Sequence, residues 1–214
     1  MPNWVFCSLE VSARSRKPKG PRDAGLAPDE HGRVSDLAAF IVAAQTPEAY
    51  LGKNGEADRI PFDFEAFIPT PMELYDVEKS YFPSGSPEEA EHKVRVDAMI
   101  AKYGSGTAYD FHCDKWDTKW NACECSVNND WRRGDGIISN TKTEHSVVFC
   151  FQTAWGAPLA LILAASQQWP KLKFSIDCEE EATMFNPFEA VFKGGRQVRL
   201  TEREPDNDEE DGDE

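Results

Sequence analysis

Apolar and polar residues alternate along several stretches of the chain. The clearest are 3–12, 145–152 and 171–178, where every second side chain is apolar or small. A period of two is typical of a strand with one buried face, so each stretch predicts a strand. Shorter strands are expected at 120–127 and 188–192. The side chains expected on the buried face are Val5, Cys7, Leu9, Val11, Val147, Phe149, Phe151, Leu172, Phe174, Ile176 and Cys178.

A helical spacing of apolar residues marks three other stretches, at 36–45, 88–103 and 158–168. The first is preceded by Ser35, a residue type that caps helix N-termini, and the second by Pro87 and followed by Gly104. These signals predict three helices. Their expected apolar stripes consist of Leu37, Phe40, Ile41 and Ala44; Val94, Val96, Met99 and Ile100; and Leu159, Ala160, Ile162, Leu163 and Ala164.

The segment 60–69 is rich in phenylalanine and is interpreted as a short strand with a bulge. Phe62, Phe64 and Phe67 would face one side, while Pro69 and Pro71 would keep the strand at an edge of the sheet.

The order of these elements indicates an α+β fold. Strand, helix and strand follow within 146–178, the length of a β-α-β unit. With the first strand and helix, the order fits a ferredoxin-like antiparallel sheet with helices on one face. We therefore expect one domain at 1–200, with insertions at 13–34 and 69–115, the latter helical and loop-like.

The net charge of −15 is unevenly spread along the chain. Residues 201–214 hold nine acids and one arginine, a charge of −8, which leaves −7 for residues 1–200. Because this tail has no apolar residue to bury, it is predicted to be disordered. A basic block at 14–22 is the exception. The overall acidity repels phosphate, so direct nucleic-acid binding is not favoured.

No apolar run approaches the length of a membrane span, and the chain opens with no basic and apolar leader. We therefore expect a soluble cytoplasmic protein without membrane contact. In that compartment its six cysteines should be reduced thiols.

The stretch 114–126 is the densest in unusual residues, with Trp116 and Trp120 four positions apart. Two tryptophans so close predict a packed corner where a loop enters the sheet, or a platform that binds a ligand. The candidate binding surface around this corner consists of Asp110, Asp114, Trp116, Asp117, Lys119, Trp120 and Glu124.

Several phrases of the chain together resemble the YubB ferredoxin-like family of phage, plasmid and integrated-element proteins. They are Pro2-Asn-Trp4, Lys115-Trp-Asp-Thr-Lys-Trp-Asn-Ala122, Phe151-Gln-Thr-Ala-Trp-Gly-Ala-Pro158, Trp169-Pro-Lys-Leu-Lys-Phe174 and Phe192-Lys-Gly-Gly195. The resemblance spans most of 2–195 and implies the fold and a mobile-element origin, without an activity. The chain departs from the family at Asp117, where glycine is usual, and at Ala157, where proline is usual.

Cysteine and histidine residues suggest two chemical alternatives. Cys113, Cys123, Cys125 and His145, with His112 and Cys150 nearby in sequence, could supply ligands to zinc. However, the spacing Cys-x-Cys is not that of a zinc knuckle, and in a strand it places both thiols on one face, where small apolar residues belong. A nucleophilic Cys113 would need His112 or His145 beside it, with Asp110 or Asp114. In a strand, His112 and Cys113 would point to opposite faces.

The polar face of the predicted sheet is a further candidate. Trp4 and Phe6 could stack on bases, as in RNA-binding modules, with Lys171 and Lys173 beside them. Glu10, Glu124 and Asp177 fall on the same face, so we expect the 69–115 insertion to cover it instead.

These observations favour a non-enzymatic acidic interaction protein of a phage or other mobile element. It would bind a host protein with a basic nucleic-acid-binding surface by charge imitation, with anti-CRISPR-like inhibition of a defence complex as one outcome. No cofactor is expected, and the compartment would be the cytoplasm of the bacterial host. The alternative is a metal-dependent or thiol enzyme that uses Cys113, Cys123, Cys125 and His145.

Overall fold

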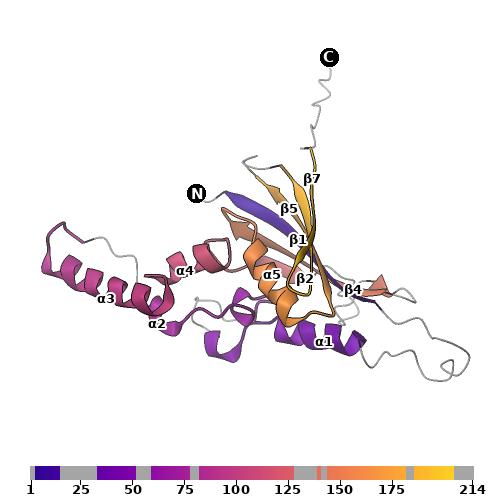
Figure 1. The fold of residues 1–214 in the computed structure, drawn as a ribbon, viewed down its shortest axis with the longest axis horizontal. Coiled ribbons are helices and arrows are strands. Elements are labelled where there is room, and N and C mark those ends of the chain that lie inside the picture. The colour runs from indigo at the N-terminus through magenta and orange to yellow at the C-terminus, as the bar shows by residue number, and fades with distance from the viewer. Residues whose placement is uncertain are drawn as a thin grey trace, which may run out of the picture.

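The computed structural model of the chain describes the residues 3–14, 33–51, 59–77, 82–127, 139–140, 144–181 and 186–204. They build a seven-stranded antiparallel sheet in the order β2-β4-β1-β5-β6-β7, with β3 paired to β4 (Figure 1). The α+β class predicted above is confirmed. The strands are β1 Trp4–Arg14, β2 Cys123–Val127, β3 Ser139–Asn140, β4 Glu144–Ala154, β5 Lys173–Glu180, β6 Phe188–Lys193 and β7 Gln197–Glu202.

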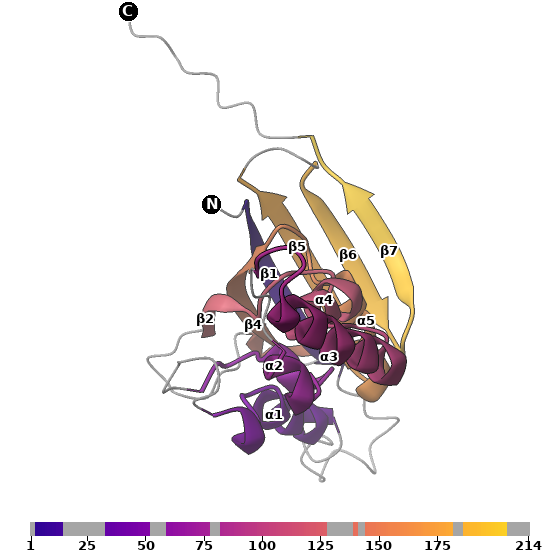
Figure 2. The ribbon, with the colours of Figure 1, turned by 90° about the vertical axis from the view of Figure 1, so that its left-hand side faces the viewer.

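The helices of the described segments cover one face of this sheet, and none of them lies on its other face, which we call the open face (Figures 1 and 2). Helix α1 packs on β1 and β4, and α5 packs on β5 and β6. None of these helices is both long and apolar enough to span a bilayer. The helices are α1 Arg33–Ala43, α2 Met72–Tyr75, α3 Pro87–Tyr103, α4 Ala108–Lys115 and α5 Leu159–Gln168, with 3₁₀ turns η1 Glu48–Tyr50 and η2 Phe64–Ala66.

The core lies between the helices and the sheet, on the face that the alternation predicted. Leu9 of β1 stands opposite Phe149 of β4 on one side and Ile176 of β5 on the other, and all three are fully buried. Phe40 of α1 closes the layer, with its ring 5.4 Å from that of Phe174. Burying one such side chain stabilises the fold by about 1.5–3 kcal/mol.

The expected strand at 60–69 is wrong, although its phenylalanines are buried as expected. The backbone instead turns into η2, because the Asp63 carboxylate accepts a hydrogen bond from the N–H of Glu65 at 2.9 Å and caps the turn. The rings of Phe62 and Phe64 then enter the core from a loop rather than from a sheet edge.

The predicted helix at 88–103 is confirmed as α3, with Ser86 as its N-cap and Gly104 in a left-handed conformation at its end. Its apolar stripe, however, does not reach the core. No residue of α3 is buried, and the side chains of Val94 and Ile100 are 68% and 48% exposed. The helix projects from the body of the protein (Figure 1).

The C-terminal part of the sheet extends further than predicted. Strand β7 was not expected, and it includes Thr201 and Glu202, which the prediction assigned to the disordered tail. The rest of that tail, at 205–214, lies outside the described residues, as do residues 15–32 of the expected basic insertion.

Candidate functional site

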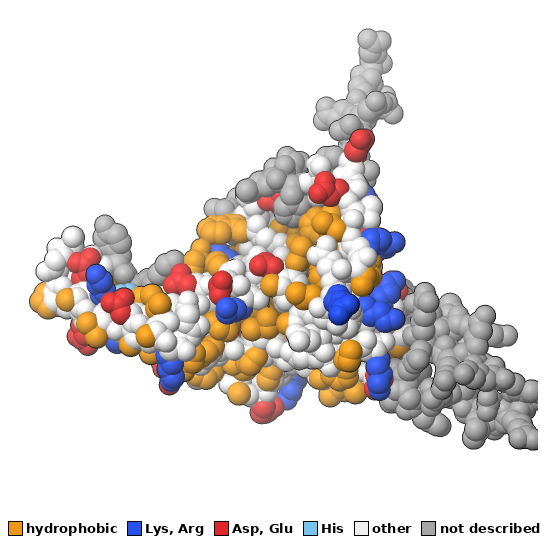
Figure 3. Space-filling view, viewed as in Figure 1, with side chains coloured by type: hydrophobic (Ala, Val, Ile, Leu, Met, Phe, Trp, Pro, Cys, Tyr) orange, Lys and Arg blue, Asp and Glu red, His pale blue; other side chains and the backbone are white. Residues whose placement is uncertain are grey.

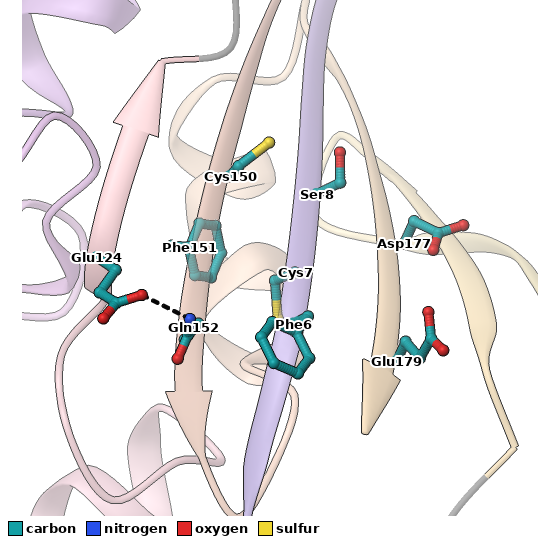
Figure 4. Close-up of a pocket in the computed structure, with 9 residues that line it drawn as sticks. All are labelled: Phe6, Cys7, Ser8, Glu124, Cys150, Phe151, Gln152, Asp177 and Glu179. Atoms are coloured by element: carbon teal, nitrogen blue, oxygen red, sulfur yellow. Dashed lines mark hydrogen bonds between the residues drawn. The ribbon is translucent and has the colours of Figure 1, made fainter. Parts of the chain in front are cut away.

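The open face of the sheet carries a hollow of about 340 Å³ (Figure 4). Phe6 and Ser8 of β1 lie at its centre, and the carboxylates of Glu124, Asp177 and Glu179 stand around them. The side chain of Phe6 is 46% exposed, a large fraction for an apolar residue in a central strand. The rest of the lining is Cys7, Cys150, Phe151 and Gln152. The hollow therefore presents an apolar ring between acids.

Strand register brings these side chains together. Phe6 pairs with Gln152 of β4 on one side and with Glu179 of β5 on the other, and Ser8 pairs with Asp177. Residues opposite each other in an antiparallel pair lie on the same face, about 5 Å apart. The alternation that buries the apolar half of β1 thus also gathers the polar half on the open face. The described parts of the insertion, at 69–77 and 82–115, lie on the helix side, so the expectation that the 69–115 insertion covers this face is wrong.

Glu124 reaches the hollow because β2 contains a bulge. Cys123 pairs with Gln152 and Ser126 with Cys150, so β2 has one residue more than β4 between the two pairs. Glu124 takes up this extra length with a φ of 49°. The amide of Gln152 donates a hydrogen bond of 2.7 Å to its carboxylate and fixes it at the rim of the hollow (Figure 4).

The hollow is negative in balance. Asp177 is paired with the guanidinium of Arg203 at 2.5 Å, and Glu124 accepts from the neutral amide of Gln152. The carboxylate of Glu179 has no hydrogen-bond or ion-pair partner among the residues that the structure describes. Three carboxylates thus face one guanidinium, which leaves the site free to attract a further cation.

An aromatic cluster continues from this hollow along the end of the sheet. The ring of Trp4, two residues before Phe6, lies 5.9 Å from that of Trp120. The ammonium of Lys119 sits 4.4 Å from the Trp120 ring and 4.3 Å from the Trp155 ring. Trp120 and Trp155 are 39% and 53% exposed, so the cluster forms an aromatic surface that already holds one cation.

Trp116, by contrast, belongs to the core and not to a contact surface. It is fully buried, its indole stacks on the ring of His112 at 3.8 Å, and its N–H donates to the carbonyl of Ile68 at 3.0 Å. The packed-corner interpretation holds for Trp116, whereas Trp120, four residues later, is at the surface.

Asp117 ties the corner to α5. Its carboxylate accepts a hydrogen bond of 2.7 Å from the N–H of Ala160 in the first turn of that helix. It has a φ of 62°, a left-handed conformation that glycine adopts without strain and that aspartate tolerates. A Cβ on Gly156 would come within 2.3 Å of the Asp117 carbonyl oxygen, so the two segments require glycine at their contact.

The other two predicted acids lie on α4. Asp110 accepts from the hydroxyl of Thr107 at the start of the helix, and Asp114 pairs with the neighbouring Lys115 at 2.7 Å. Of the predicted surface, Lys119, Trp120 and Glu124 lie at the hollow or its aromatic extension.

The predicted thiol and metal residues are not gathered into one group. Within the described segments, no cluster of three or more histidine, cysteine, aspartate or glutamate side chains could hold a metal ion. Cys113 is exposed on α4, a helix rather than the expected strand, while His112 faces the interior. Burial raises the pKa of the Cys125 thiol to about 12, which opposes ionisation. The side chain of His145 lies outside the described residues.

A buried polar cluster lies beneath the corner. Glu65 is 2% exposed; its carboxylate accepts from the hydroxyl of Tyr75 and, at 2.6 Å, from the N–H of Thr70. Burial raises the pKa of Glu65 to about 7. His112 contacts the hydroxyl of Thr70 at 3.0 Å and the carbonyl of Lys119 at 3.3 Å, and burial lowers its pKa to about 4. Each polar group here has an internal partner, so the cluster joins η2, α2 and α4.

Comparison with known proteins gives little further guidance. No model of a protein family matches the chain, and no curated protein matches it. Among solved structures, it is similar to the crystal structure of the protein api92 from Yersinia pseudotuberculosis, of family model DUF1281. The sequence identity is 9%, the match covers 96% of this chain and 99% of that one, and the TM-score is 0.39. A similarity this distant carries no activity from one protein to the other.

Sequence reasoning placed Phe6, Glu124 and Asp177 on one face but missed Glu179 and Trp155. Glu179 could have been found, because it lies one residue beyond the predicted end of β5 and faces the same side as Asp177 if the strand continues. Trp155 follows β4 directly, and only the tertiary contact with Lys119 reveals its place in the cluster.

Proposed function

We propose that this protein is a non-enzymatic interaction protein that binds a basic segment of a partner protein on its open sheet face. The observation that carries the proposal is the exposed ring of Phe6 among the carboxylates of Glu124, Asp177 and Glu179. A lysine or arginine side chain has an apolar stem and a cationic head, so its stem can cover Phe6 while its head lies between Glu124 and Glu179.

The strength of binding has to come from several such contacts. An exposed ion pair contributes about 0–1 kcal/mol, and an exposed cation–π contact about 0.5–1 kcal/mol. The exposed rings of Trp120 and Trp155 extend the surface and can serve as anchors, since tryptophan is enriched among the residues that dominate binding energies. The net charge of −15 adds long-range attraction that speeds encounter with a basic partner.

The partner class follows from this chemistry. Protein surfaces that bind nucleic acid carry clustered lysine and arginine, and an acidic face competes for them. We therefore infer a partner with such a surface, and we extend the proposal to a host protein and a mobile-element origin on the resemblance noted above.

The same resemblance motivates a finer proposal on the fold. The chain order β1-α1-β2-β4-α5-β5 and the spatial order β2-β4-β1-β5 support a ferredoxin-like arrangement, extended by β6 and β7.

Fluorescence anisotropy with a labelled arginine-rich peptide tests the binding proposal. The double variant Glu124→Gln/Glu179→Gln should weaken binding about tenfold, because it removes two carboxylates from the hollow. The double variant Glu88→Gln/Glu91→Gln on exposed positions of α3 changes the net charge equally and serves as the matched control. Equal losses in both variants would show that only total charge matters and would refute the site. Phe6→Ala should weaken binding without any change in charge.

A further inference from the structure

Strand β7 leaves one edge of the sheet open. It is the last strand in the order β2-β4-β1-β5-β6-β7, and it pairs only with β6 among the described strands. All six of its residues are exposed. An open edge offers unpaired N–H and C=O groups to another strand, and proteins usually protect such edges. The opposite edge strand, β2, is five residues long and is bulged along most of its length, whereas the bulge of β7 lies at its first residues, so the regular part of β7 from Arg199 to Glu202 is the edge that can accept a strand.

The helix-side face of β7 is apolar. Leu200 pairs with Ala190 of β6, a buried core residue, so Leu200 continues the core face of the sheet, and Val198 lies two residues before it in a bulge. Yet they are 51% and 59% exposed, and Leu163 on the neighbouring helix α5 is 38% exposed. Figure 3 shows hydrophobic side chains at the surface in the region of α5 and β7. Val198 and Leu200 thus form an apolar strip on β7 that the described chain leaves about half exposed.

Arg199 and Arg203 are ion-paired with Glu189 and Asp177 within the sheet, and the remaining charge along β7 changes sign from one end to the other. Lys193 and Arg196 lie at the turn that begins the strand, and Glu202 and Glu204 lie at its end. A second strand of the same sequence therefore fits best when it runs antiparallel, because its acidic end then meets the basic turn of the first. A parallel copy would place like charges together.

We propose that two copies of this chain associate through antiparallel pairing of β7 with β7. Residues opposite each other must lie on the same face, and the register centred on Leu200 satisfies this with Leu200 opposite itself. It also places Arg199 opposite Thr201 and directs the acidic end of each strand towards the basic turn of the other. The register centred on Arg199 would oppose two guanidiniums. The two sheets then form one continuous sheet, and the apolar strips meet across the two-fold axis.

The association is weak, since one pair of strands and two small apolar strips bury less than a standard interface of about 1,600 Å². Sedimentation velocity of the full chain, from a few micromolar to several hundred micromolar, tests it. The mass should rise with concentration from 24.0 kDa towards twice that value. Leu200→Lys should stay monomeric throughout, because two ammonium groups would then face each other. Val42→Lys, at a position of α1 that is 71% exposed, is the matched control and should behave as wild type. A wild-type chain that stays at 24.0 kDa, or a dimer that Leu200→Lys leaves intact, would overturn the proposal.

Cross-linking tests the register. In a background with Cys113→Ser and Cys150→Ser, which removes two thiols outside the core, Leu200→Cys should form an intermolecular disulfide on mild oxidation. Opposite residues of an antiparallel pair have Cα atoms 4.5–5.5 Å apart, within the range that a disulfide spans. Arg199→Cys, the neighbouring position on the other face, should not cross-link. The reverse result would replace this register by the one centred on Arg199, and no cross-link in either variant would refute the pairing.

This inference is independent of the proposed binding site. Leu200 and Phe6 lie on opposite faces of the sheet, and the strands β5 and β6 lie between β1, which carries Phe6, and β7. The Leu200→Lys chain should bind the arginine-rich peptide as wild type does. A wild-type chain that dimerises but does not bind the peptide would refute the binding proposal alone. A wild-type chain that binds the peptide but stays monomeric would refute the strand pairing alone.

Discussion

Replacing Glu65 with glutamine should make the free energy of unfolding rise more steeply with pH than it does in the wild type. Glu65 and His112 are both buried beneath the Trp116 corner, and burial disfavours the charged form of each. The neutral form of a carboxyl group carries its proton, whereas the neutral form of an imidazole has released one. The two residues therefore affect the pH dependence of folding in opposite directions.

The pKa of Glu65 is about 7 in the folded protein, against 4.5 ordinarily. Between these values the folded state binds more protons than the unfolded state, so stability falls as pH rises from 4.5 to 7, by about 3 kcal/mol in total. The pKa of His112 is about 4, against 6.5 ordinarily. The unfolded state binds more protons in that window, so stability rises from pH 4 to 6.5 by a similar amount, about 3 kcal/mol. In the wild type the two slopes nearly cancel between pH 4.5 and 6.5.

Glu65→Gln removes the first slope and keeps an uncharged side chain, whose amide oxygen can accept from the Thr70 N–H while its NH2 group donates to the hydroxyl oxygen of Tyr75. Urea unfolding at half-unit steps from pH 4 to 8 measures the result. The difference in unfolding free energy between variant and wild type should grow in favour of the variant by about 3 kcal/mol across this range. Glu91→Gln, on exposed α3, should give a constant difference. A constant difference for Glu65→Gln as well would refute the reasoning that Glu65 is held protonated by burial.

Three further predictions concern thiols, the tail and metal. In the native protein Cys113 should react with a thiol reagent within minutes, whereas Cys7 and Cys178, buried on the central strands, should react only after denaturation. Mass spectrometry of the labelled peptides measures this, and equal labelling of all three cysteines in the native protein would contradict it. Removing residues 205–214, which carry seven acids, should leave the melting temperature unchanged, because no core residue is lost, and should slow association with an arginine-rich peptide in low salt. Elemental analysis should find far less than one zinc per chain, and a stoichiometric content that Cys125→Ser abolishes would support the enzyme alternative instead.

The elements with a regular pattern could be predicted from sequence, because their burial follows directly from backbone geometry. The alternation of β1 places Val5 and Leu9 in the core and leaves Phe6 outside, so both the core face and the centre of the hollow could be predicted. The alternation in β7 was too short to predict a strand, because it includes only two apolar residues, Val198 and Leu200, on either side of Arg199, and both are more than half exposed.

Side-chain to backbone bonds and tertiary contacts account for the rest. The cap that Asp63 gives to η2 overrides the strand pattern of the phenylalanines around it. Glu65 would normally be placed at the surface, and its burial depends on Tyr75, ten residues away. The spacing in α3 correctly predicts a helix, but no spacing tells whether another element covers its apolar side.

The projection of α3 from the body has a consequence for how this sequence can change. Its base is fixed by the ammonium of Lys102 on Glu73 at 2.7 Å and by Val96, which packs against Gly106. Its 17 residues extend about 25 Å, and none of them is buried. Substitutions towards its N-terminal end therefore leave the unfolding free energy of the domain almost untouched. That end of the helix can be rebuilt, lengthened or recoded for new contacts while the sheet keeps the sequence that its core demands.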